Sequence, residues 1–139
     1  MSATSALRRG RAAHEKLMID RCVIESVTTS ATLNEATGNY DTIRTRVYPP
    51  LSSLDADGPC LLAFNDTVVQ QVDAAGQILT QNTAILSLPV ATSTEVAKDH
   101  IVTYTASVND ADLVGVQLRV EGPQHETFGT ARKLRVEET

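Results

Sequence analysis

The chain is poor in the residues that most often carry recognition or catalysis. Among 139 residues it has no tryptophan, five other aromatic residues, two cysteines and three histidines. Two cysteines so far apart exclude a disulfide framework and a Cys-x-x-Cys metal site, and we expect Cys22 and Cys60 to be small buried thiols. The aromatic residues are scattered and the net charge is -5. Single-strand or sequence-specific nucleic-acid binding is therefore not expected.

Long apolar runs are also missing. No run approaches the roughly 18 residues that a membrane-spanning helix needs, and no apolar segment follows the N-terminal arginines, as it would in a secretory signal. The length and a mean hydropathy of -0.11 are typical of one soluble domain. We expect no membrane association and a location inside a cell or in a particle assembled there.

Catalytic and metal-binding motifs are lacking too. His14, His100 and His125 are far apart, and there is no Gly-x-Ser-x-Gly elbow or Walker-type Gly-Lys-Ser/Thr motif. Asp110 and Asp112 lie in a turn-like stretch, where carboxylates usually accept bonds from backbone N–H groups. We therefore predict no enzyme activity, no metal and no cofactor.

The clearest pattern that is present lies between His100 and Val136. Val116, Leu118 and Val120 alternate with polar residues, which is typical of a half-buried strand. Short β-rich runs flank it at residues 102–105 and 134–136, with turn residues between them. The pattern predicts an antiparallel meander to which earlier strands can add.

The earlier part of the chain predicts a helix followed by further strands. Residues 1–18 have helical spacing with Ser2 or Thr4 as the cap. Strand-like runs follow at residues 19–27, 42–48, 59–64 and 78–88, with a turn at 34–39 and a loop at 51–58. We predict a mainly β fold, a small antiparallel β-barrel with an N-terminal α-helix. Residues 1–18 are the helix, and 19–139 are one barrel domain with an inserted loop at about 65–77.

Charge is unevenly distributed along the chain. Residues 1–21 have five basic and two acidic side chains, residues 132–139 have three and two, and the segment between them has a net charge of -9. The apolar face of the helix is mostly alanine and glycine, so we infer that a partner surface holds it. The candidate docking residues of the helix are Arg8, Arg9, Arg11, His14 and Lys16. The candidate subunit or adaptor contacts near the C-terminus are Arg132, Lys133 and Arg135.

A series of weak motifs runs through nearly the whole chain in a fixed order. It begins at residues 10–18 and 20–24 and continues through Thr37-Gly38, Val47-Tyr48, Gly58-Pro59-Cys60, Ala75-Gly76-Gln77, Leu86-Ser87-Leu88-Pro89, Leu113-Val114-Gly115, Arg119-Val120 and residues 130–134. In this order and spacing the chain resembles a family of head-to-tail connector proteins from tailed phages of actinobacteria, of the stopper (head-completion) type. Two departures are Asn34-Glu35-Ala36 in place of an Asp-Pro turn and an insertion at Pro49–Asp57.

The resemblance implies a virion protein at the portal vertex, assembled in the host cytoplasm. Copies would form a ring below the portal and adaptor, retain packaged double-stranded DNA without sequence-specific binding, and dock a tail terminator or tail tube. By position, the loop that closes the channel would consist of Asn65, Asp66, Thr67, Val68, Val69, Gln70, Gln71, Val72, Asp73, Ala74, Ala75, Gly76 and Gln77. The insertion at Pro49–Asp57 is a second candidate loop.

Three alternatives remain open from the residues alone. A tail terminator or tail-completion protein would have a similar β-rich build. A small β-barrel binding module for a ligand or oligonucleotide is a different class. A hydrolase that uses Cys60 or His125 is the weakest alternative, because no partner residues accompany either side chain.

Overall fold

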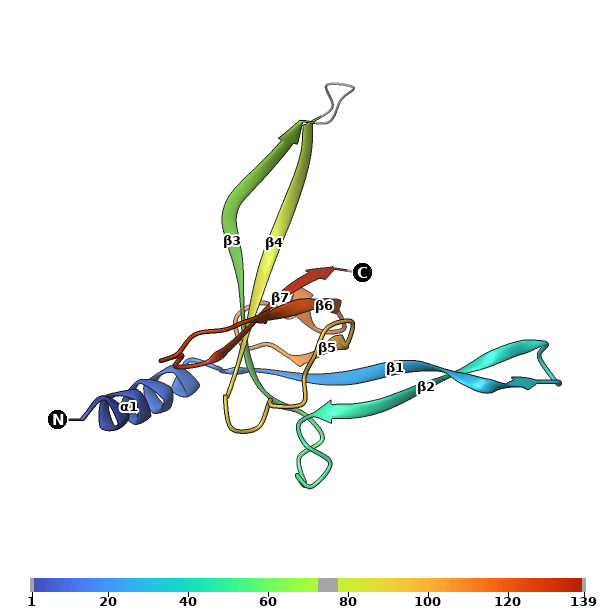
Figure 1. The fold of residues 1–139 in the computed structure, drawn as a ribbon, viewed down its shortest axis with the longest axis horizontal. Helices are drawn as coiled ribbons and strands as arrows, with labels where there is room; N and C mark the ends of the chain where they lie inside the picture. Colours follow the sequence, from blue (N-terminus) through green and yellow to red (C-terminus); the bar gives the residue numbers. More distant parts are fainter. Residues whose placement is uncertain (1, 73–77, 139) are drawn as a thin grey trace.

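The computed structural model describes residues 2–72 and 78–138, and their side chains outside residues 64–83. Within these residues the chain forms one α-helix, one 3₁₀ helix and seven antiparallel strands (Figure 1). They are α1 (Ala3–Lys16), β1 (Asp20–Asn34), β2 (Asn39–Tyr48), β3 (Gly58–Val72), β4 (Ile78–Leu88), β5 (Ile101–Ala106), η1 (Ala111–Leu113), β6 (Gln117–Gln124) and β7 (Arg132–Glu138). No helix in these ranges is both long and apolar enough to cross a bilayer.

The strands form one sheet that closes on itself. Their order is β2-β1-β3-β4-β7-β6-β5, and β1 also pairs with β5. Six strands thus make a ring, while β2 lies outside it along β1. The predicted mainly β fold with an N-terminal helix is confirmed, and so is the β5–β6–β7 meander.

The core fills the inside of this ring. Alternate residues of the meander point inward: Val102 and Tyr104 on β5, Leu118 and Val120 on β6, and Leu134 and Val136 on β7 are all at most 2% exposed. The other strands contribute Cys22, Ile24, Tyr48, Cys60, Leu86 and Leu88, and the segment between β4 and β5 contributes Val96. The period-two alternation of the sequence therefore marks the core face of these strands.

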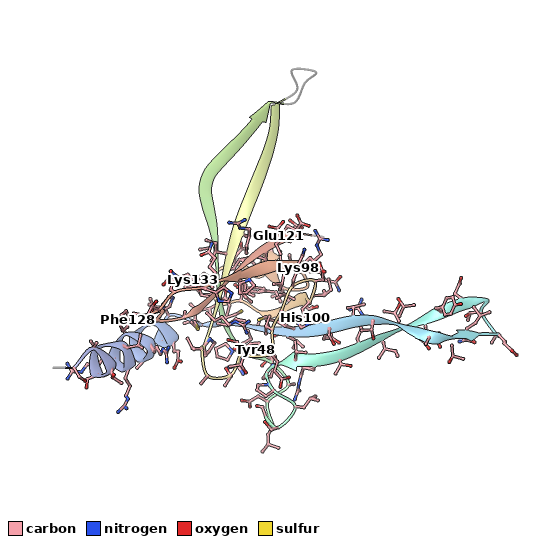
Figure 2. All side chains as sticks on the ribbon, in the orientation of Figure 1. Tyr48, Lys98, His100, Glu121, Phe128 and Lys133 are labelled. Carbon is pink, nitrogen blue, oxygen red and sulfur yellow. The ribbon has the colours of Figure 1, made fainter. Side chains whose placement is uncertain are left out.

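Three elements project from this core (Figure 1). The outer parts of β1 and β2 form one hairpin arm, and those of β3 and β4 form a second one. Helix α1 extends in the direction opposite to the β1–β2 arm. Figure 2 shows side chains crowded together in the core, whereas those of the β1–β2 arm stand apart along the hairpin.

Two predicted element boundaries were wrong. The strand predicted to end at Val27 continues to Asn34, and the one predicted from Thr42 begins at Asn39. The inserted loop predicted at about 65–77 begins as strand instead. Residues up to Val72 belong to β3 and pair with β4 from Asn65↔Thr83 to Val72↔Ile78, and residues 73–77 lie outside the described residues.

Candidate functional site

The two ends of helix α1 are stabilised by residues close to them in the sequence. The side chain of Ser2 accepts a hydrogen bond from the backbone N–H of Ser5, as predicted for the cap. His14 and Lys16 lie in the last turn, where positive charge opposes the partial negative charge of the helix end. None of its residues is fully buried: on the predicted alanine and glycine face Gly10 is half-buried, whereas Ala3, Ala6 and Ala13 are exposed.

The helix contacts the core only near the segment that precedes β7, among the contacts described. Arg11 Nε donates a hydrogen bond of 3.2 Å to the carbonyl oxygen of Gly129, and His14 Nδ1 lies 2.8 Å from Thr130 Oγ1. A Cβ atom on Gly10 would lie only 2.9 Å from Thr130 Cγ2. The glycine therefore permits the close approach of the helix to this segment.

A cavity of about 300 Å³ lies at this junction and has a basic lining. Arg11 of α1 and Arg132 of β7 both line it, together with His125 and one acidic residue, Glu126. Arg132 Nη2 donates to the backbone oxygen of Val96, whereas Arg132 Nη1 is buried without a hydrogen-bond partner among the described residues. Burial also lowers the pKa of the Arg132 guanidinium, because it disfavours the charged form.

The predicted basic contact residues therefore separate into two groups. Arg11 and Arg132 come together at the cavity although 121 positions separate them in the sequence. Arg8, Arg9 and Lys16 are exposed on α1, and His14 bonds to Thr130. On β7, Arg135 is exposed and Lys133 is half-buried, and neither belongs to the residues that line the cavity.

The β1–β2 arm carries large apolar side chains in solvent. Leu33 pairs with Tyr40 and Thr28 with Ile43, and the exposed fractions of Leu33, Tyr40 and Ile43 are 47%, 55% and 49%. At its tip Gly38 has φ +73°, which glycine adopts readily, and its N–H bonds to the oxygen of Asn34 within the predicted turn at residues 34–39. The sequence reasoning missed this arm, although its run of threonines was a signal for extended strand.

The tip of the arm is acidic. Asn34 Nδ2 donates to both carboxylate oxygens of Asp41, at 3.2 and 3.3 Å, and Glu35 is exposed in the turn. No lysine or arginine lies between Arg21 and Arg44. The tip therefore presents negative charge that no basic side chain of the same arm neutralises locally.

The insertion at Pro49–Asp57, which follows β2, is held to the sheet by hydrogen bonds and an ion pair. Arg46 donates hydrogen bonds to the backbone oxygens of Pro50, Ser53 and Asp55. At its end Arg21 Nε forms a 2.9 Å ion pair with Asp57, whose other oxygen accepts a bond from Thr105. The Thr105 hydroxyl and then Arg21 hold the pKa of Asp57 below its ordinary value of 3.8.

The thiols and the tyrosine hydroxyl of the core are buried and form hydrogen bonds there. Cys22 and Cys60 are both buried, as predicted, and a hydrogen bond between the thiols together with burial raises the pKa of Cys22. The Tyr104 hydroxyl donates to Asp20, and burial raises the pKa of Tyr104. A thiol of raised pKa is a poor nucleophile, so these contacts fit a structural role.

Other predicted residues lie in structural turns. Asp110 accepts a 3.0 Å bond from the N–H of Asp112, as expected for a turn carboxylate. His100 Nδ1 accepts a bond from Ala97, and burial lowers the pKa of His100. Across residues 2–72 and 78–138, no three His, Cys, Asp or Glu side chains gather as metal ligands.

Residues 10–137 match a family of unknown function, DUF6093, and the chain belongs to that family. No curated protein matches the chain.

Proposed function

We propose that this DUF6093 protein is a structural subunit of a phage head-to-tail stopper ring, which closes the DNA channel after packaging and docks the tail. The observation that carries the proposal is the shape of the chain. A small closed core holds together by itself, while a helix and two hairpin arms project from it.

Such projections favour a protein that works by contact with neighbours. A two-stranded hairpin is marginally stable in water by itself, and a row of exposed apolar side chains on a protein surface usually marks an interaction site. The β1–β2 arm is such a hairpin, and it exposes apolar side chains on both faces: Leu33 and Tyr40 on one, and Ile43 on the other. A protein that bound only a small ligand would need neither arm.

The β3–β4 arm is the element that we assign to channel closure. It lies at the position where the resemblance puts the closing loop, and its strands run as a paired ladder from Asn65↔Thr83 outward. A hairpin reaches further than a loop of equal length can reliably do, because each strand residue adds about 3.3 Å. The acidic middle of the chain suits a channel in which DNA phosphates must slide.

The placement of the projections supports ring assembly. Helix α1 and the β1–β2 arm lie at opposite ends of the molecule (Figure 1). Different surfaces on two flanks give heterologous contacts, which close into a ring when the rotation between copies allows it. The proposed partners are therefore further copies of the chain, the portal or adaptor above and the tail below.

The test shortens each arm separately at a backbone pair. Joining Asn65 to Thr83 through an Asn-Gly turn removes the outer β3–β4 arm, and joining Thr29 to Thr42 in the same way removes the outer β1–β2 arm. We expect the first variant to fold and to reach the portal vertex, but filled heads that carry it should lose DNA. The second variant is the matched control, and it should fail to assemble rather than assemble and leak.

Electron microscopy of particles and measurement of packaged DNA decide the outcome. Density for the protein in a ring around the DNA exit axis is the expected result. Heads that retain their genome with the shortened β3–β4 arm would remove that arm from channel closure. Association with isolated tail tubes instead of heads would favour a tail terminator, and a free monomer in infected cells would overturn the proposal.

A further inference from the structure

The cavity between α1 and the core has an excess of positive charge. Arg11, Arg132 and His125 line it, against the one carboxylate of Glu126. Arg132 Nη1 is buried there without a hydrogen-bond partner among the described side chains. A buried guanidinium nitrogen that lacks an acceptor lowers the stability of the fold, because its hydrogen bonds to water are lost and no protein hydrogen bond replaces them. Oxyanions are the preferred partners of a guanidinium, because arginine binds them with paired N–H donors.

The opposite end of the molecule has the complementary charge. Glu35 and Asp41 lie at the tip of the β1–β2 arm, and the amide of Asn34 holds the Asp41 carboxylate in place. Glu35 is exposed, and the nearest basic residues in sequence are Arg21 and Arg44. Figure 1 places this tip at the far end of the molecule from α1. The tip cannot reach the cavity of its own chain without unfolding the ring.

We propose that the cavity between α1 and the core binds a carboxylate, Glu35 or Asp41, from the β1–β2 tip of a second copy of this chain. Arg132 Nη1 would then receive an acceptor, and the guanidinium of Arg11, whose Nε already bonds to Gly129, would gain a second one. The contact is heterologous, because tip and cavity are different surfaces. It deepens the proposed function by naming the residues that join neighbouring subunits, and it rests on that function only for the closure of the contacts into a ring.

The lining favours a carboxylate over a phosphate. Glu126 lies among the lining residues, and a phosphate with nearly two negative charges would be repelled by it more strongly than a carboxylate. A cavity of about 300 Å³ is at the small end of the range for ligand pockets, and it has room for the end of one acidic side chain.

A cross-linking experiment on the full chain tests the contact. Arg11→Lys, and separately Arg132→Lys, keeps the positive charge and adds an amine that a carbodiimide joins to a carboxylate with loss of water. Copies labelled with a heavy nitrogen isotope are mixed with unlabelled copies, so that a link between two molecules has one peptide of each kind. We expect such mixed links from position 11 or 132 to Glu35 or Asp41.

Matched controls separate this contact from chance encounters. Glu35→Gln with Asp41→Asn should abolish the mixed links, whereas Asp55→Asn, which removes an exposed carboxylate from the loop after β2, should leave them unchanged. Arg132→Glu should weaken self-association in sedimentation at least roughly tenfold, and Glu35→Arg with Asp41→Arg on the same chain should restore it. Restored self-association would show that Arg132→Glu acts through the charge of the contact, because a variant that only unfolds the protein would not be rescued by reversing the charge of the tip.

The results distinguish this inference from the proposed function. Absence of mixed links, or links that map to other carboxylates, overturns the cavity contact even if imaging places the protein in a ring at the vertex. Mixed links in a protein that imaging places elsewhere support the contact and overturn the stopper role. Protection of Arg11 and Arg132 by duplex DNA, without the links, would assign the cavity to phosphate and overturn the inference.

Discussion

The ring of strands and the β1–β2 arm share strand β1, yet the two parts of that strand lie in different surroundings. Cys22 and Ile24 are fully buried in the ring, whereas Val27 and Leu33 further along the same strand are exposed. The ring obtains its stability from burial of apolar area. The arm has only its backbone ladder and pairs such as Thr28↔Ile43. One strand is therefore buried at one end and solvent-exposed at the other.

A substitution in the core and one in the arm should show the largest difference in their effect on the free energy of unfolding. Leu134→Ala removes a side chain with no exposed surface, and we expect it to lower the free energy of unfolding by about 2–5 kcal/mol. Ile43→Ala, on a side chain that is 49% exposed, should change that free energy by less than about 0.5 kcal/mol. Urea unfolding of the isolated chain measures both values. Equal losses would mean that the arm packs against the core.

A second comparison concerns Gly58, the first residue of β3, which lies against Tyr48 at the end of β2. A Cβ atom on Gly58 would lie 2.7 Å from two ring atoms of the buried Tyr48. Gly58→Ala should therefore cost about 1–3 kcal/mol in unfolding free energy, because the ring must move within a packed core. Gly122→Ala is the control, since nothing lies within 4 Å of the added atom. A loss no larger than the control's would contradict this packing of Tyr48.

The smallest expected effect concerns Asp57 and pH. Because its pKa in the folded chain is below 3.8, Asp57 contributes stability that is complete above that value and is lost as the pH falls through the folded pKa. Asp57→Asn should therefore destabilise the protein at neutral pH by less than about 1 kcal/mol, since both partners are about one-third exposed. Unfolding at pH 7 and at pH 3 should show that this difference shrinks in acid. With Asp55→Asn the difference should be absent at both values.

The parts of the fold that could be predicted are those with one buried face. Leu118 and Val120 alternate with exposed Gln117 and Arg119, so the strand and its core face are visible in the sequence. The arm lacks this contrast, since Thr28, Thr29 and Ala31 are all exposed, and neither face gives a pattern. A strand that is solvated on both sides cannot be located by hydrophobic periodicity.

For the candidate site, the sequence predicted the charged residues but not which of them come together. The basic character of Arg11 and Arg132 is evident from composition. Their meeting depends on ring closure, which places the segment before β7 beside α1. The acidic tip depends likewise on the length of the arm, which sets the distance between Glu35 and the core. Both are properties of topology, and no local pattern in one sequence encodes them.

The course of β1 through the molecule has a mechanical consequence. The backbone leaves α1 at Leu17, enters β1 at Asp20 and runs to Asn34 without a turn, so one extended line of peptide units joins the helix to the far tip. The ladder bonds from β1 to β3 and β5 are perpendicular to that line. A pull along the line loads those bonds in shear, in which many must break at once. Under the proposed function, this geometry would let each subunit resist a pull between its neighbours in an assembly that holds a packed genome.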